Sequence, residues 1–157
     1  MSIQVIRQAD LKPFWGSTNA GVAGHGRWIV TPVGGPEGYL HMNRDDPGAV
    51  TTESCTGGLI VLPSGVSSPG LHVHNDFDEI YVVVSGRVAA IGPDGKDQHL
   101  GEMDWVWIPR GTNHGLRNSG FNDARVIYFQ TGVERAGFQT GEAENLGGSS
   151  WLLGQNS

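Results

Sequence analysis

Four residues in the middle of the sequence have the types and the spacing of a metal site. His72 and His74 are two residues apart, so on a β-strand both imidazoles project from the same face. Glu79 follows after a segment that can turn, and a Glu79 that faces inward on the next strand would bring its carboxylate beside them. His114 comes from a separate hairpin. Three neutral imidazoles and one carboxylate suit Mn, Fe, Co, Ni, Cu or Zn, and suit Ca poorly.

Positioning these residues requires short strands joined by tight turns, and the sequence is typical of such a fold. Glycine accounts for 25 of the 157 residues. The glycines are scattered irregularly, which suits turns between strands better than long helices. We expect one helical turn at residues 8–11 and an antiparallel sandwich or barrel. Its predicted strands cover residues 27–33, 58–63, 71–74, 79–86, 87–92, 104–109 and 124–129.

The length of the chain fits a single domain with a hydrophobic core. We expect residues 1–50 to form an arm that adds strands to the barrel or to a partner. Residues 51–133 are predicted to form the barrel itself. Residues 134–157 form a glycine-rich C-terminal tail, whose apolar segment at 151–153 is expected to pin it to the barrel.

Composition argues against several classes of function. The net charge of −6 disfavours general affinity for nucleic acid or anionic membranes. No apolar run approaches the ~20 residues that span a bilayer, and the N-terminus lacks the pattern of a signal peptide. A single cysteine, Cys55, cannot form an internal disulfide. These features predict a cytoplasmic protein.

Two motifs resemble those of the cupin superfamily. The first is a glycine followed by H-x-H, three or four residues, E, six residues and G. From the first histidine onward it is matched by His72, His74, Glu79 and Gly86. The second ends in P-x-G-x-x-H-x-x-x-N, which the segment Pro109–Asn118 matches completely. The two motifs lie in the family's order, separated by a short hairpin, and together they are highly specific.

Two glycines of the family pattern are displaced in this chain. Val66 stands where the first motif begins, and Gly65 comes one residue too early. In the second motif Met103 stands where a glycine is expected, six residues before Pro109. Both glycines serve turns rather than metal binding, so these departures concern loop geometry and not the ligands.

The resemblance implies an all-β fold, the cupin double-stranded β-helix or jelly-roll barrel. It also implies one divalent transition metal ion per chain (Fe, Mn, Ni or Zn, with Fe(II) favoured). The ligands it implies are His72, His74, Glu79 and His114. Such a set leaves one or two coordination positions open, as a catalytic metal requires. A divalent ion with one carboxylate leaves a net charge of +1, which favours an anionic oxygen ligand such as an enolate, phenolate or carboxylate.

Two further residues are candidates for catalysis. Tyr81 shares the inward parity of Glu79, so its hydroxyl could serve as an acid or a hydrogen-bond donor at the site. A core tyrosine with a satisfied hydroxyl fits the pattern equally well. Arg110 lies on the loop before His114 and could meet an anionic substrate, although an exposed loop arginine is the simpler interpretation.

The fold does not fix the reaction. Among cupins we favour a non-haem Fe(II) dioxygenase that acts on a small, oxygen-rich organic substrate. The alternative is a redox-neutral cyclase, isomerase or lyase that uses the metal as a Lewis acid. Small cupins that resemble aromatic polyketide cyclases have a similar length and motif order. A third class, a ligand-binding module without catalysis, would need an appended segment, and residues 1–50 show no helix-turn-helix pattern.

A homodimer is predicted from the segment between residues 104 and 108. Alternation places Val106 and Ile108 on one face and Trp105 and Trp107 on the other. If the aliphatic pair fills the barrel, two tryptophans point outward, which suits an interface between subunits. The alternative is that the N-terminal arm or the segment at 151–153 covers them within the same chain.

Overall fold

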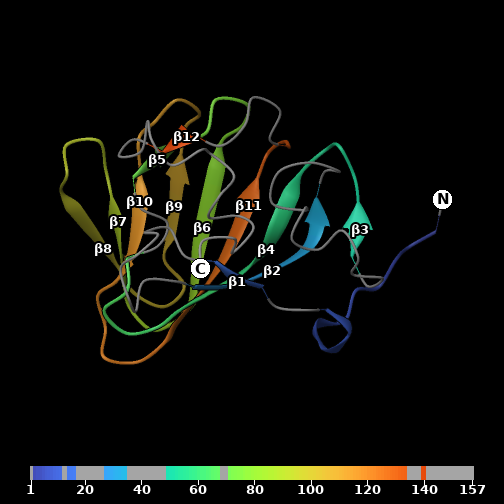
Figure 1. Ribbon diagram of the computed structural model, residues 1–157, viewed down its shortest axis with the longest axis horizontal. Helices are drawn as coiled ribbons and strands as arrows, with labels where there is room; N and C mark the ends of the chain where they lie inside the picture. The colour runs from blue at the N-terminus through green and yellow to red at the C-terminus, as the bar shows by residue number, and fades with distance from the viewer. Residues whose placement is uncertain are drawn as a thin grey trace.

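The computed structural model describes residues 2–11, 14–16, 27–34, 49–67, 71–133 and 139–140. Within these ranges it consists almost entirely of β-structure (Figure 1). The elements are η1 (Gln8–Asp10), β1 (Phe14–Gly16), β2 (Arg27–Gly34), β3 (Val50–Thr51), β4 (Thr56–Leu62), β5 (His72–Val73), β6 (Glu79–Ser85), β7 (Val88–Ile91), β8 (Asp97–Leu100), β9 (Trp105–Ile108), β10 (Gly115–Asn118), β11 (Ala124–Gln130) and β12 (Gln139–Thr140). Among the described residues no helix is long and apolar enough to span a membrane.

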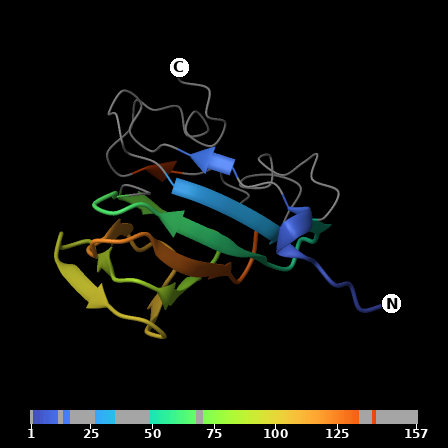
Figure 2. The same ribbon diagram turned by 90° about the horizontal axis from the view of Figure 1, so that it is seen from below.

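Two main sheets form the barrel. The larger has the strand order β1-β2-β4-β11-β6-β9, with β3 added beside β2. The smaller has the order β10-β7-β8, and β12 and β5 form a short separate pair. Figure 2 shows the sheets as layers, with β8 and β2 on opposite sides of the barrel. All the strand pairs are antiparallel except β2 with β3. The all-β barrel expected from the sequence is therefore confirmed.

The register of the larger sheet stacks the inward side chains in rows. At one end of the barrel Gln130 on β11 lies opposite Glu79 on β6. The next row places Tyr128 opposite Tyr81. Alternation along β11 keeps every second residue buried, as period-2 geometry requires. Further from Glu79 the rows become apolar and join the core cluster, which includes Ile29, Ile60, Leu62, Val83, Ala124 and Val126.

A glycine on β4 allows a tyrosine to reach across that strand. A Cβ atom at Gly58 would collide with the carbonyl oxygen of Val30 and would lie 2.8 Å from the Tyr128 hydroxyl oxygen. The Tyr128 hydroxyl is hydrogen-bonded to Thr31 Oγ1 on β2. Burial raises the pKa of Tyr128 well above its ordinary value, despite the opposing effect of Thr31, so the phenol is neutral. The absence of a side chain at position 58 thus makes room for a buried link between β11 and β2.

The predicted strands form close to their expected bounds, and η1 occupies the predicted helical turn. β8 and β10 were not predicted. The side chains of β8 before Leu100 are all polar and exposed, so the strand carries no apolar alternation, and β10 lies inside the second motif. β1 and β2, from the segment predicted to be an arm, extend the larger sheet beyond β4. The apolar segment at 151–153 lies outside the described residues, so the role of the tail stays a prediction.

Candidate metal centre

Backbone pairing brings together two of the four predicted ligands. The N–H of His72 donates to the carbonyl of His114, and the N–H of His114 donates to the carbonyl of His72, both at 2.9 Å. Residues that are directly opposed in this way project their side chains to the same side of the pair. The two imidazole centroids lie 4.2 Å apart. His74 shares the face of His72, and their Nε2 atoms are 3.1 Å apart.

Glu79, at the start of β6, completes the cluster. Its Oε2 atom lies 2.9 Å from His114 Nε2 and 3.6 Å from His74 Nε2. One ligand atom from each of the four buried residues lies within 4.8 Å of the others. A transition metal with ligand bonds of about 2.1 Å separates its ligand atoms by roughly 3–4 Å. The cluster therefore has the dimensions of a coordination sphere.

The hydrogen bonds of His114 also fit a cation. Its Nδ1 atom lies 2.8 Å from the carbonyl oxygen of Thr112. A carbonyl only accepts, so Nδ1 must carry a proton, and Nε2 of the neutral ring then presents a lone pair. That lone pair faces the carboxylate of Glu79, which also only accepts. A proton or a metal ion is needed between them, and a backbone partner on the other ring nitrogen is typical of metal-bound histidine.

Electrostatics within the cluster favour an ionised Glu79. Burial opposes ionisation, but the attraction of His74 and the hydrogen bond with His114 outweigh it and hold the pKa of Glu79 well below its ordinary value. Burial lowers the pKa of His114, but the hydrogen bond with Glu79 prevails and raises it above its ordinary value. The site thus holds a fixed negative charge among imidazoles, as a cation-binding site requires.

Two side chains hold the Glu79 carboxylate from inside the barrel. The Tyr81 hydroxyl donates to Oε2 at 2.7 Å, and Gln130 Nε2 donates to Oε1 at 2.9 Å. Both side chains are buried. The inward parity predicted for Tyr81 is therefore found, and its hydroxyl contacts a residue of the cluster. Gln130 was not predicted, although its place on the inward face of β11, two residues after Tyr128, was a usable signal.

Arg110 lies on the surface beside the cluster. Its guanidinium Nε is 3.2 Å from Asp78 Oδ1, and its side chain is 60% exposed. The backbone N–H of Arg110 donates to the same carboxylate oxygen at 3.0 Å. The structure therefore brings Arg110 to Asp78, the neighbour of Glu79. That Arg110 binds an anionic substrate stays a prediction.

A family model described as a cupin domain matches residues 58–130. This range contains the four clustered residues, and the barrel around them is the double-stranded β-helix of similar solved structures. Residues 58–130 therefore form a cupin domain. No curated protein matches the sequence.

Solved cupin structures share the fold at low sequence identity. The DMSP lyase DddQ from Ruegeria pomeroyi DSS-3 is 17% identical, with a TM-score of 0.65 over 87% of this chain and 64% of that one. The polyketide cyclase RemF from Streptomyces resistomycificus is 17% identical, with a TM-score of 0.62 over 88% of this chain and 85% of that one. A predicted oxalate decarboxylase from Thermotoga maritima is 22% identical, with a TM-score of 0.61 over 83% of this chain and all of that one. At such identities the likeness concerns the fold alone.

The last residue of the second cupin motif has a structural role in this chain. Asn118 is buried, and its side-chain amide nitrogen donates to the carbonyls of Leu62 and Asn122, both at 2.8 Å. Its side-chain oxygen accepts from the N–H of Gly120 at 2.8 Å. Asn118 thus ties the loop after β10 to the end of β4, at the opposite end of β10 from His114.

The two displaced glycines of the cupin pattern have separate explanations. Gly65, with φ of +74°, lies in a turn closed by a hydrogen bond from Val66 N–H to Pro63 O, and Val66 is buried in the core. Met103 has φ of +66° and is the one non-glycine residue with positive φ in the described part of the chain. The turn before β9 therefore keeps the left-handed conformation of the family glycine but places a methionine in it, at an energetic cost.

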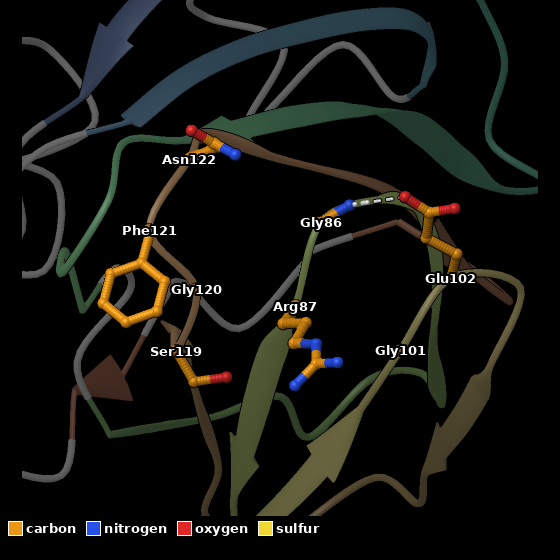
Figure 3. A pocket seen from close by; sticks show the side chains of 8 residues that line it. All are labelled: Gly86, Arg87, Gly101, Glu102, Ser119, Gly120, Phe121 and Asn122. Carbon is orange, nitrogen blue, oxygen red and sulfur yellow. Dashed lines mark hydrogen bonds between the residues drawn. The ribbon is translucent and has the colours of Figure 1, made fainter.

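A cavity of about 660 Å³ lies at the other end of the barrel. Gly86 and Arg87 follow β6, and Ser119 follows β10, whereas the metal cluster lies where these two strands begin. At its edge Glu102 Oε1 accepts a hydrogen bond from the Gly86 N–H at 3.2 Å (Figure 3). None of the described residues that line this cavity belongs to the cluster. The cavity is therefore separate from the metal centre.

Proposed function

We propose that the protein is a metal-dependent cupin enzyme that performs redox-neutral chemistry, of the isomerase, lyase or cyclase class, on a small oxygen-rich anion. The observation that carries this proposal is the hydrogen bond of 2.7 Å from the Tyr81 hydroxyl to Glu79 Oε2. This hydrogen bond supports a role for the Tyr81 hydroxyl as an acid–base group, because the hydroxyl is in direct contact with a residue that would bind the metal. Such chemistry requires a group of this kind, whereas an oxygenase does not.

The four clustered side chains of His72, His74, Glu79 and His114 would hold one divalent ion. When bound, the ion supplies Lewis-acid polarisation of a carbonyl or carboxylate oxygen. Because three neutral imidazoles and one carboxylate leave a net charge of +1 on such a site, an anionic oxygen is the preferred ligand.

Tyr81 is positioned to move a proton next to that oxygen. Its ring centroid lies 6.3 Å from that of His114, and Glu79 holds its hydroxyl proton. A positioned phenol can donate a proton to a developing alkoxide or enolate and take one back, and general acid–base catalysis contributes about 10²–10⁴-fold to rate. Gln130 and Tyr81 together fix the carboxylate, so the hydroxyl stays aimed at the cluster.

The test compares metals and oxygen. The protein is stripped with a chelator, reloaded anaerobically with Zn(II) or Fe(II), and screened with small phenols, diketones and keto acids. We expect turnover with Zn(II) in the absence of O₂. In the Tyr81→Phe variant we expect kcat to fall by about 10²-fold or more while metal content is unchanged. Turnover that requires both Fe(II) and O₂ would contradict the proposal and support the dioxygenase favoured by the sequence.

We also propose that the outer face of the larger sheet pairs with a second copy of the chain. Trp105 and Trp107 on β9 are 66% and 62% exposed. The register continues this face across β6 to β11, where Ile127 and Phe129 are also exposed. The exposed apolar area is on the order of 500 Å², the size of the largest patch on a typical monomer, which is often functional, and a major part of the ~800 Å² per subunit of a stable dimer.

Charge also favours a second copy as the occupant of this face. Alternation leaves Arg125 as the one charged side chain at the outward positions of β4, β6, β9 and β11. The chain as a whole carries a net charge of −6. Two copies that met through any acidic surface would repel each other, whereas this face brings together apolar surfaces with little charge.

A further inference from the structure

Among the described residues, the side-chain amide of Gln130 has a hydrogen-bond partner for its nitrogen but none for its oxygen. The side chain is 1% exposed. Its Nε2 atom donates to Glu79 Oε1 at 2.9 Å, and within the described ranges no donor reaches its Oε1 atom. A buried amide oxygen without a donor is destabilising, and buried polar groups in proteins are usually paired. Where such an atom lies beside a metal-binding cluster, the missing donor is expected from a ligand.

The orientation of this amide follows from its neighbour. If the amide were rotated by half a turn, its oxygen would face the carboxylate oxygen of Glu79, and two acceptors would oppose each other. Glu79 therefore fixes the nitrogen toward itself and the oxygen away. The hydrogen-bonding partner, Glu79, thus decides which end of the Gln130 side-chain amide is the nitrogen and which is the oxygen.

The hydroxyl groups on the neighbouring inward positions are engaged elsewhere. Thr56, opposite Gln130 on β4, donates to the carbonyl of Gly132 at 3.3 Å. The Tyr81 hydroxyl donates to Glu79, and the Tyr128 hydroxyl pairs with Thr31. No hydroxyl of these rows is directed at Gln130 in the described part of the barrel, so its oxygen remains an acceptor without a donor.

We propose that Gln130 Oε1 accepts a hydrogen bond from a hydroxyl group of the substrate and so selects 2-hydroxy carboxylates or 2-hydroxy ketones. This inference rests on the proposed function. Glu79 Oε2 belongs to the metal cluster and Glu79 Oε1 contacts the amide, so the amide oxygen is one residue removed from the ligand atoms. A hydroxyl on the carbon next to a substrate oxygen bound at the cluster would supply the donor that this acceptor lacks.

Binding of two matched probes tests the proposal without turnover. The protein is loaded with Co(II), and its visible absorption is titrated with lactate and with propionate, which differ by the 2-hydroxyl group. We expect lactate to bind more tightly than propionate to the unaltered protein. In Gln130→Met, which keeps the length and loses both polar atoms, we expect the ratio of the two affinities to fall by about tenfold. Gln98→Met, an exposed position on β8, is the matched control and should leave the ratio unchanged.

The ratio separates substrate recognition from the positioning of Glu79. Loss of the Gln130 Nε2 donor weakens the hold on Glu79, and this should lower the affinity for Co(II) and for both anions alike. The titrations are therefore made at saturating Co(II), with the cobalt spectrum as a check that the site is intact. If the ratio in Gln130→Met equals that of the unaltered protein, Gln130 only positions Glu79 or binds water, and the inference is wrong.

Failure of the inference and failure of the proposed function give different results. If the unaltered protein binds Co(II) and both anions but the ratio of the two anion affinities is the same in Gln130→Met, only the inference fails. If it takes up no metal, or turns over only with Fe(II) and O₂, the proposed function fails. Gln130→Leu, of similar volume but different shape, is the second variant if Gln130→Met does not fold, and the same loss of the ratio is expected.

Discussion

Asp78 and Arg110 join the two segments that supply the candidate metal ligands. The Asp78 carboxylate accepts hydrogen bonds from both the backbone N–H and the Nε of Arg110. Asp78 also exchanges hydrogen bonds with Thr131, through its own N–H to Thr131 Oγ1 and its carbonyl from the Thr131 N–H, each at 3.0 Å. One residue therefore connects the loop before β6, the loop before His114 and the end of β11.

Replacing Asp78 should loosen the metal site without removing a ligand. For Asp78→Ala we expect metal affinity to fall by about tenfold, because residues that support the ligands typically contribute 10–100-fold. The measurement is competition with a chromophoric chelator. Asp94→Ala is the matched control, since Asp94 likewise accepts a backbone N–H and pairs with a cation, Lys96, on an exposed hairpin. Equal affinities for the two variants would contradict the role given to Asp78.

The contribution of Asp78 should depend on pH in one direction. The backbone hydrogen bond from Arg110 lowers the pKa of Asp78 below its ordinary value, and this effect outweighs burial. A depressed pKa stabilises the folded state above the unfolded pKa and loses that contribution as pH falls through the folded one. The difference in melting temperature between the unaltered apoprotein and Asp78→Ala should thus be constant near neutrality and shrink below about pH 4. A difference that grows on acidification would contradict this.

Removal of two histidines should abolish metal binding and leave the barrel folded. In the double variant His72→Ala, His74→Ala we expect no bound transition metal by elemental analysis and an unchanged far-UV spectrum. Because a ligand that binds only the folded state stabilises it, metal should raise the melting temperature of the unaltered protein and not that of the variant. Full occupancy in the variant would exclude these residues as ligands.

Met103→Gly should stabilise the protein. Met103 holds φ of +66° and its side chain is exposed, so glycine relieves backbone strain and removes few contacts. The strain of about 1–2 kcal/mol is partly offset by the greater entropy of glycine in the unfolded chain, and we expect a net gain of about 0.5–1 kcal/mol in denaturant unfolding. Gln98→Gly, within β8, is the contrasting control and should be destabilising.

Gly58 and Gly57 should respond differently to the same substitution. A Cβ at Gly58 meets backbone and the Tyr128 ring, whereas a Cβ at Gly57 lies 3.4 Å from Phe129 Cδ2, an ordinary contact. We expect Gly58→Ala to lower the free energy of unfolding by about 3 kcal/mol or more and Gly57→Ala by less than about 1 kcal/mol. Similar losses at both positions would mean that β4 shifts to accommodate a side chain.

The dimer is tested by removing its two tryptophans. We expect light scattering at micromolar concentration to give the mass of two chains for the unaltered protein. The variant Trp105→Ser, Trp107→Ser should give the mass of one chain, because it removes the two most exposed aromatic side chains of β9. A clean monomer in the unaltered protein would reject the dimer and leave the alternative that the N-terminal arm or the segment at 151–153 covers the tryptophans within the same chain.

Much of the metal site could be predicted from the sequence because it depends on local rules. The parity of a strand places His72 with His74, and Glu79 with Tyr81, without any knowledge of the partners of those strands. The second motif supplied His114, and its place beside the other three residues followed from the family resemblance. These residues are recognised by type and spacing alone.

The rest of the site depends on long-range register. Gln130 faces Glu79 because β11 pairs with β6 in one register, and a shift of one residue would turn its side chain outward. Asp78 has the composition of a turn residue, and its role as a connector arises only when the loop before His114 lies against it. β8 has exposed polar side chains, and its strand conformation comes from pairing with β7 rather than from its own residues.

The backbone pair between His72 and His114 has a consequence for the order of events during folding. It closes a loop of about forty residues, and contacts of such sequence separation form slowly. The chain must pair β7 with β10 and bring the hairpin of β9 alongside β6 before the two imidazoles meet. Metal uptake during refolding should therefore follow the recovery of tertiary structure, and the bound ion would report that the barrel has closed.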